Sequence, residues 1–219
     1  MDFRWCYRKN YSDAKLLDRQ DAMNLAPLAL PSSRYMSLAT KAYNRQFDDI
    51  VCSTALGSVI TGENGSTTTS FLAGQQIAAA GTGLTISKLI NAAEILNTNE
   101  VDESADRVIV VHPRQITNML QSLEVRSDDY NTVKALVAGK VDSFMGFKFV
   151  KNTRLTKVST TRSCVAFVRG AVQMVRGGLN ARVDQLPTQN YAWQFYYDFD
   201  LSGTRLHDEG VVQIDCIEV

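Results

Sequence analysis

The sequence predicts an α+β fold in which helices come first and strands come last. Three observations predict it. Apolar residues recur at helical spacing over residues 35–55 and again over 86–96. Residues 108–111, Val-Ile-Val-Val, form a short continuous apolar run, as in a fully buried strand. After Gly139 the chain reads as strand throughout.

The first 31 residues are polar and irregular, and they end at Pro27 and Pro31. Phe3, Trp5 and Tyr7 alternate with polar residues, which is typical of a half-exposed strand. This segment carries too few apolar residues to form a core alone, so we expect it to lie against another part of the fold.

The longest amphipathic helix is expected next, with Ser32 or Ser33 as its N-cap and its end at Gly57. Residues 61–83 are rich in glycine, serine, threonine and alanine, and predict a long surface turn or hairpin. Within it, Gly62, Asn64 and Gly65 suit a two-residue hairpin turn.

A second helix is expected after Thr85, whose hydroxyl can cap it. The buried strand at 108–111 is followed by Pro113, a residue that favours the first turn of a helix, so one strand-to-helix step is predicted here. A further short helix is expected from Ser127 to Gly139.

Strands are predicted for the rest of the chain. Gly146 suits a tight bend, and residues 164–170 and 171–178 are expected to pair as a hairpin. Residues 192–200 and 211–219 alternate in polarity on either side of the Ser202-Gly203 pair.

Composition excludes several functional classes. The 23 lysines and arginines balance the 23 aspartates and glutamates, so no net field draws the chain to nucleic acid or to an anionic membrane. Cys6, Cys52, Cys164 and Cys216 are far apart and predict neither a zinc site nor a disulfide framework, but reduced and mostly buried thiols. No apolar run approaches the ~20 residues of a membrane helix, so we expect a chain that stays in the cytoplasm in which it is made.

Candidate catalytic and binding residues have simpler structural interpretations. His112 stands at a strand-to-helix junction, where α/β enzymes place ligands, but no nucleophile or carboxylate motif accompanies it, so a structural histidine is favoured. The Gly81-Thr82-Gly83 sequence resembles half of a phosphate loop, yet it lacks the lysine and hydroxyl of that motif, which favours a helix-entry turn.

Asp102, Glu103 and Asp106 could hold a hard cation, but their spacing does not match a calcium loop and favours a solvated turn. An aromatic run at residues 195–199 could stack on bases, yet no basic groove accompanies it, so strand core or subunit packing is favoured. We therefore expect no catalytic, cofactor-binding or metal-binding residues.

The order of these segments resembles one family. Residues 35–65, YMSLATKAYNRQFDDIVCSTALGSVITGENG, resemble the spine helix and glycine-rich loop of tailed-bacteriophage major capsid proteins with the Hong Kong 97-like fold. LTISKLINAAEIL, RVIVVHPRQITNMLQ and the DYN…GFKFVKN segment are similar to the helix, strand and helix that lead into the axial domain. CVAFVRGAVQMV resembles the central hairpin, and residues 193–219 resemble the closing strands.

The resemblance implies a division of the chain: a partial extended loop at 1–31, the spine helix and the first part of the peripheral domain at 32–104, the axial domain at 105–185, and peripheral strands at 186–219. Because residues 1–21 resemble only the returning part of the extended loop, the N-terminal arm is expected to be lacking.

The resemblance also implies a structural subunit that catalyses nothing and needs no cofactor. It would assemble with itself into hexamers and pentamers of an icosahedral head around double-stranded DNA, in the cytoplasm of a bacterial host. Scaffold, portal and decoration proteins are the implied partners; sequence-specific nucleic-acid binding and membrane binding are not expected. We expect subunit contacts between Arg4, Arg8 and Lys9 of one copy and Asp48 and Asp49 of the next.

Two alternatives stay open. An encapsulin-like nanocompartment shell would share the fold but enclose an enzyme cargo. A small α+β hydrolase or ligand-binding domain would instead need a pocket that joins His112 to the acidic turn.

Overall fold

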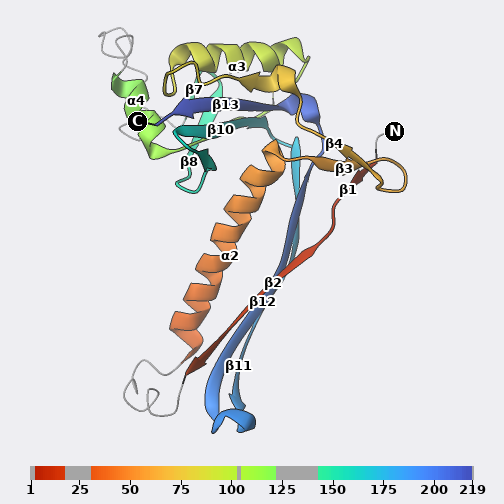
Figure 1. Ribbon diagram of the computed structural model, residues 1–219, viewed down its shortest axis with the longest axis vertical. Coiled ribbons are helices and arrows are strands. Elements are labelled where there is room, and N and C mark those ends of the chain that lie inside the picture. Colours follow the sequence, from red (N-terminus) through yellow and green to blue (C-terminus); the bar gives the residue numbers. More distant parts are fainter. Residues whose placement is uncertain (1–2, 18–30, 103–104, 122–142, 219) are drawn as a thin grey trace. The chain divides into compact units, whose positions relative to one another are not determined.

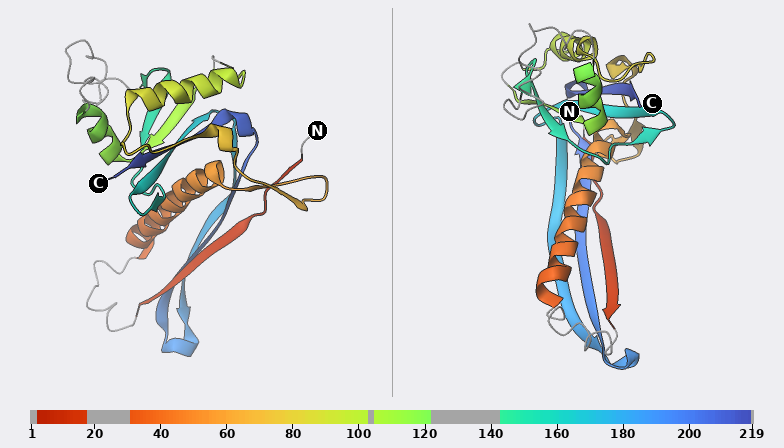
Figure 2. Two further views of the ribbon diagram at one scale, coloured as in Figure 1. Left: turned by 45° about the horizontal axis from the view of Figure 1, so that its top comes forward. Right: turned by 90° about the vertical axis from the view of Figure 1, so that its left-hand side faces the viewer.

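A computed structural model describes residues 3–17, 31–102, 105–121 and 143–218 (Figures 1 and 2). Its helices are α2 (Pro31–Leu56), α3 (Ile86–Thr98) and α4 (Pro113–Gln121), with short 3-10 turns η1 (Ala73–Gln75), η3 (Pro187–Gln189) and η4 (Asp208–Gly210). Its strands are β1 (Arg4–Trp5), β2 (Lys9–Leu17), β3 (Val59–Thr61), β4 (Thr67–Thr69), β5 (Gln76–Ile77), β6 (Arg107–Val111), β7 (Ser143–Phe144), β8 (Phe147–Lys151), β9 (Lys157–Val158), β10 (Thr161–Val168), β11 (Val172–Leu186), β12 (Ala192–Arg205) and β13 (Val211–Ile217). The predicted α+β class is confirmed.

The chain forms two compact units. The first contains residues 1–5, 51–173 and 204–219, and the second contains 6–50 and 174–203. These boundaries differ from the sequence division, since β13 lies in the sheet of the first unit, outside the 105–185 range. The names axial and peripheral domain stay a prediction.

The large sheet of the first unit has the strand order β5-β13-β10-β6-β8-β7, with β9 also paired to β10. Its centre is β10, which runs antiparallel to β13 over seven residue pairs and antiparallel to β6 on its other edge. The predicted buried strand is confirmed as β6, where Ile109 and Val111 are fully buried. β6 and β8 are parallel, and α4 follows β6 directly, so the predicted strand-to-helix step is confirmed.

Helix α3 covers one face of this sheet, as Figures 1 and 2 show. Thr85 is its N-cap, as predicted: the side-chain oxygen accepts a hydrogen bond from the backbone N–H of Lys88. Leu89, Ala92 and Leu96 recur at helical spacing on its inner face and are fully buried. The core of the first unit therefore lies between α3, α4 and the sheet.

A small sheet, β1-β3-β4, belongs to the same unit. The hairpin predicted after residue 61 is confirmed as β3–β4, but residues 62–66 connect the strands instead of a two-residue turn. Gly62 and Gly65 adopt φ angles of 91° and 64°, which explains the glycines. Beyond the hairpin, β5 adds a parallel edge to β13, a pairing that the sequence did not indicate.

The second unit combines most of α2 with an antiparallel sheet of order β11-β12-β2. β2 and β12 pair from Trp193↔Leu17 to Leu201↔Lys9. Among the described residues of this unit, Ile50, Phe199 and Leu201 form one buried cluster, and the ring of Tyr43 lies edge-on to Phe199 at 5.2 Å. Ala39, Ala192 and Phe195 are buried as well.

Three further predictions have a definite outcome. The tight bend at Gly146 is confirmed, with φ 79° in the β7–β8 turn. The hairpin of 164–170 with 171–178 is wrong: β10 pairs with β13, β6 and β9, whereas β11 pairs with β12. The predicted cap of α2 is also wrong, since the helix begins at Pro31 and includes both serines.

The helix expected at 127–139 lies outside the described residues. Within the part of the chain that is described, no helix is both long and apolar enough to cross a membrane.

Candidate functional site

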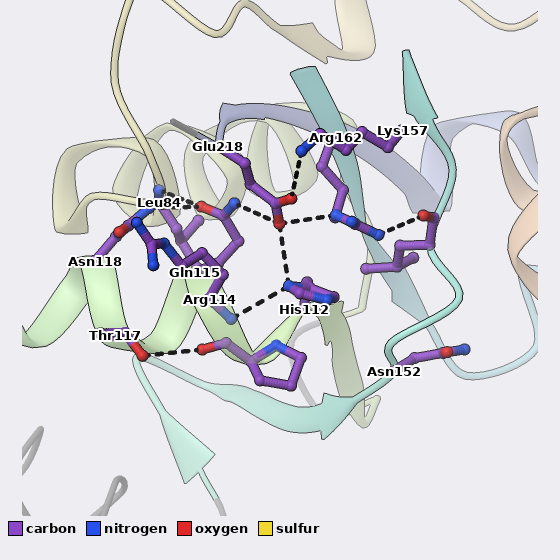
Figure 3. A network of polar contacts seen from close by, with 12 residues as sticks. Leu84, His112, Arg114, Gln115, Thr117, Asn118, Asn152, Lys157, Arg162 and Glu218 are labelled. Atoms are coloured by element: carbon purple, nitrogen blue, oxygen red, sulfur yellow. Dashed lines mark hydrogen bonds and ion pairs between the residues drawn. The ribbon is translucent and has the colours of Figure 1, made fainter. Parts of the chain in front are cut away.

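A buried carboxylate at the end of β13 organises one corner of the first unit (Figure 3). Arg162 on β10 donates from Nε to the Glu218 Oε1 atom at 2.7 Å, and the Lys157 ammonium lies 3.2 Å from Oε2. The Glu218 side chain is only 8% exposed, so these two cations compensate a charge that is largely withdrawn from water.

The same carboxylate connects to α4 through Gln115. The Gln115 amide donates to Glu218 Oε1 at 3.4 Å, and its own Oε1 accepts from the backbone N–H of Leu84 at 2.9 Å. Arg162 also donates from Nη1 to the Leu155 carbonyl at 2.7 Å. One network thus ties the end of β13 to β10, to α4 and to the turn before α3.

His112 completes the network. Its Nδ1 lies 3.0 Å from Glu218 Oε1 and 3.2 Å from the backbone nitrogen of Arg114. When Nδ1 carries no proton, it accepts a hydrogen bond from the backbone N–H of Arg114. When Nδ1 is protonated, it donates to Glu218 instead and the bond from Arg114 is lost. The predicted structural role of this histidine is supported by both contacts.

Electrostatics favour a charged carboxylate and a neutral imidazole here. Burial alone would raise the pKa of Glu218, but the hydrogen bonds from Arg162 and Lys157 outweigh it and lower that pKa. Burial and the nearby Arg162 charge lower the pKa of His112, although Glu218 opposes this. The Glu218 carboxylate oxygens already have partners within the chain, which favours a structural role for this network over a catalytic one.

A second cluster surrounds Arg205, whose side chain is fully buried. Its Nη1 donates to the carbonyl oxygens of Ala55 at 2.9 Å and Gly57 at 2.8 Å, and its Nε donates to Asp208. Arg4 donates to the other Asp208 oxygen at 2.8 Å. Burial would raise the pKa of Asp208, but hydrogen bonds from Arg205 and Arg4 lower it overall.

A third buried cation is Lys88 on α3. Its Nζ lies within 2.8–3.0 Å of four backbone carbonyl oxygens, those of Ala79, Thr82, Gly83 and Asp215. The Gly81-Thr82-Gly83 segment is therefore a helix-entry turn whose carbonyls are held by a lysine.

The acidic turn and His112 lie at opposite ends of β6. Asp106 precedes that strand and His112 follows it, so an extended backbone separates them by roughly 20 Å. Asp106 faces Arg169 at 3.5 Å on an exposed surface. Among the described residues, no three His, Cys, Asp or Glu side chains are grouped so that they could hold a metal ion. Asp106 and His112 are therefore too far apart to line one small pocket, which counts against the hydrolase alternative.

The residues predicted to make subunit contacts lie in different settings. Arg4 is held by Asp208 of its own chain. Arg8 is 68% exposed, with its Nη1 3.9 Å from Asp200. Lys9 and Asp48 are exposed and Asp49 is half-buried. Contact between the basic and the acidic group of two copies stays a prediction.

Sequence reasoning missed Glu218, Arg205 and Lys88. A single charged residue within a strand or helix carries no spacing signal, and their partners are mostly backbone carbonyls or residues more than 50 positions away. Only the Arg205–Asp208 spacing is local enough to have suggested a pair.

Comparison with known proteins decides the family. A model of the phage capsid protein family matches residues 1–218. This chain belongs to the phage capsid protein family. None of the curated proteins matches the sequence.

Solved phage capsids share the fold of this capsid protein. Mycobacterium phage Che8 matches with a TM-score of 0.71 at 17% identity, over 94% of this chain and 70% of that one. The capsid of Ralstonia phage GP4 matches with a TM-score of 0.69 at 11% identity, over 98% and 74%. The SrpI encapsulin complex of Synechococcus elongatus matches with a TM-score of 0.60 at 10% identity, over 97% and 74%. The fold is thus the Hong Kong 97-like fold that phage capsids and this encapsulin have in common.

The family match separates the two kinds of shell, because it is a phage capsid model that covers the chain. The chain is a major capsid protein: a structural subunit that assembles with copies of itself into a multi-subunit shell, the capsid of the virion.

Proposed function

We propose that this capsid protein forms hexamers and pentamers of an icosahedral head that encloses double-stranded DNA, and that it has no catalytic role. The second unit carries the argument. Among the described residues, it consists of most of α2 and a three-stranded sheet, and its main buried cluster, around Ile50, Phe199 and Leu201, leaves much of its apolar surface uncovered.

Large apolar side chains stay exposed on that unit. They are Tyr7, Leu16, Met36, Leu38, Tyr191 and Trp193, with exposed fractions from 38% to 59%. Exposed aromatic and long aliphatic groups are typical of surfaces that become buried on association. Packing against neighbouring copies would supply the burial that this unit lacks.

Charge suits a DNA container. The chain has a formal net charge of +0, so a shell made of it would hold the genome without a strong field on its inner surface. We propose assembly in the bacterial cytoplasm, with scaffold, portal and decoration proteins as partners. Residues 105–185 are proposed as the axial domain, with 32–104 and 186–219 as peripheral parts.

Subunit contacts are proposed between Arg8 and Lys9 of one copy and Asp48 and Asp49 of α2 in the next. Arg4 contributes less, because Asp208 already binds its guanidinium. Reversing both acids, Asp48→Lys with Asp49→Lys, is expected to reduce assembly; unchanged assembly would rule this contact out.

Nuclease protection tests the container role. Particles purified from cells are treated with nuclease, and the protected contents are then extracted. Long double-stranded DNA is the result expected for a phage head. A protein cargo without DNA would instead favour the encapsulin alternative, which shares the fold.

A further inference from the structure

A groove lies within the second unit, between the first half of α2 and the face of the sheet. It has a volume of about 350 Å³. Its floor includes Phe195, which is 4% exposed, and its α2 wall includes Leu38 and Ala42. Leu38 is 57% exposed, so an apolar surface stays open to a ligand or partner at the rim.

The groove is positively charged at its rim. Lys41 and Arg45 line it from α2, and both are exposed. The Asp13 carboxylate in the same groove already lies 3.5 Å from Lys15 and accepts a hydrogen bond from the Tyr197 hydroxyl at 3.4 Å. Within the described ranges, no ion pair is found for Lys41 or Arg45. The groove therefore fits an apolar or aromatic side chain that is accompanied by an acid.

An exposed aromatic side chain with an acid nearby is present on the same chain, at the tip of the β11–β12 hairpin. The Tyr191 side chain is 59% exposed there, and Asp184 is exposed on β11. The turn is tight: Asn190 and Tyr191 have φ angles of 50° and 57°, and the Tyr191 N–H bonds to the Leu186 carbonyl at 3.0 Å. A left-handed backbone is costly for tyrosine, so the surrounding turn must hold the backbone of Tyr191 in this conformation while its side chain stays exposed.

We propose that Tyr191 of one copy inserts into this groove of a second copy, with Asp184 facing Lys41 and Arg45. The inference rests on the proposed function, since it needs copies of the chain in one shell. An aromatic ring beside Phe195 and Leu38 buries apolar area, and Lys41 or Arg45 over its face adds a cation–π contact. Because the tip and the groove are different surfaces, the contact is heterologous, and it can be repeated from one copy to the next.

A charge exchange tests the pairing. Lys41→Glu alone and Asp184→Lys alone are each expected to lower the assembled fraction in sedimentation velocity by about tenfold. The double variant is expected to restore the assembled fraction, because a glutamate at 41 and a lysine at 184 again attract each other with the charges exchanged. Single variants that assemble like the wild type, or a double variant whose loss equals both losses together, would overturn the proposal.

Removing the Tyr191 ring tests the role of that side chain. Tyr191→Asn keeps a residue that tolerates the left-handed backbone, so the turn stays intact while the ring is lost. Assembly is expected to fall while the thermal unfolding of the chain is unchanged. The matched control is Val158→Asn, at a residue of the first unit that is 70% exposed, and it should assemble normally.

Cysteine pairing locates the contact. Copies carrying Leu38→Cys and copies carrying Tyr191→Cys, both with Cys6→Ser, are assembled together and oxidised. A disulfide-linked dimer joining the two variants is expected, and its absence would overturn the inference. If the wild type forms no assembly at all, the proposed function fails; if it assembles and Tyr191→Asn assembles equally well, only this inference fails.

Discussion

Arg205 binds the C-terminal end of α2, with its Nη1 2.9 Å from the carbonyl oxygen of Ala55. Both residues belong to the first unit. The last carbonyls of a helix have no partner within it, and here a buried guanidinium supplies one while also pairing with Asp208.

Replacing Arg205 by methionine is therefore expected to destabilise the fold by about 3–5 kcal/mol, because Asp208 is left with a reduced set of partners in a buried site. Urea unfolding measures the change. The matched control is Arg169→Met, whose exposed pair with Asp106 should contribute about 0–1 kcal/mol. Equal effects of the two variants would contradict the role given to Arg205.

The Glu218 network predicts a pH dependence of stability. The folded pKa of Glu218 is lowered from 4.5, so its contribution is present above that pH and is lost as the pH falls through the folded pKa. The folded pKa of His112 is lowered from 6.5, so protonating it also costs stability below pH 6.5. In the wild-type protein the free energy of unfolding should therefore decline as the pH falls below 6.5, and decline again as it falls below 4.5.

Two variants separate these contributions. His112→Gln should remove the decline just below pH 6.5 and keep the acidic one, whereas Glu218→Gln should weaken the acidic one. Unfolding midpoints measured in urea from pH 8 to pH 3 check this, with pH values chosen on the order of one unit apart. A His112→Gln profile identical to the wild type would show that His112 does not titrate in this network.

Lys88→Met is expected to destabilise the first unit by about 2–4 kcal/mol, since four carbonyl oxygens lose their shared donor in a buried position. Lys148→Met is the control, because Lys148 is exposed on β8. Thermal unfolding of both variants gives the comparison. A Lys88→Met variant as stable as the control would show that the four carbonyl oxygens do not depend on the Lys88 ammonium as their donor.

Two adjacent glycines in β11 provide a matched pair in the second unit. A Cβ atom on Gly177 would lie 2.6 Å from the Asp200 Cβ on β12, whereas one on Gly178 would meet nothing within 4 Å. Gly177→Ala should therefore destabilise the unit by about 1–3 kcal/mol, and Gly178→Ala should be neutral or slightly stabilising. Circular dichroism melts measure both, and a reversed order would contradict the β11–β12 packing.

Local signals explain what could be predicted from the sequence. The end of α2 before Gly57, the Thr85 cap, the buried strand at β6 and the start of α4 at Pro113 each depend on a few neighbouring residues. The order of these segments was sufficient to suggest the capsid family, which the family model then showed.

Partner choice among strands could not be predicted in the same way. Residues 164–170 and 171–178 look like a hairpin, but β10 pairs with β13 from more than 40 positions away, and β11 pairs with β12. Strand pairing is decided by long-range packing, which alternating polarity does not encode. The buried polar clusters were missed for the same reason, because Glu218 and Arg162 are neighbours only in the folded chain.

Electron microscopy of the purified protein tests the central claim most directly. Closed shells of uniform size, built from this one chain, are the result that the capsid assignment predicts. A compact monomer at every concentration, with no closed particles, would contradict it.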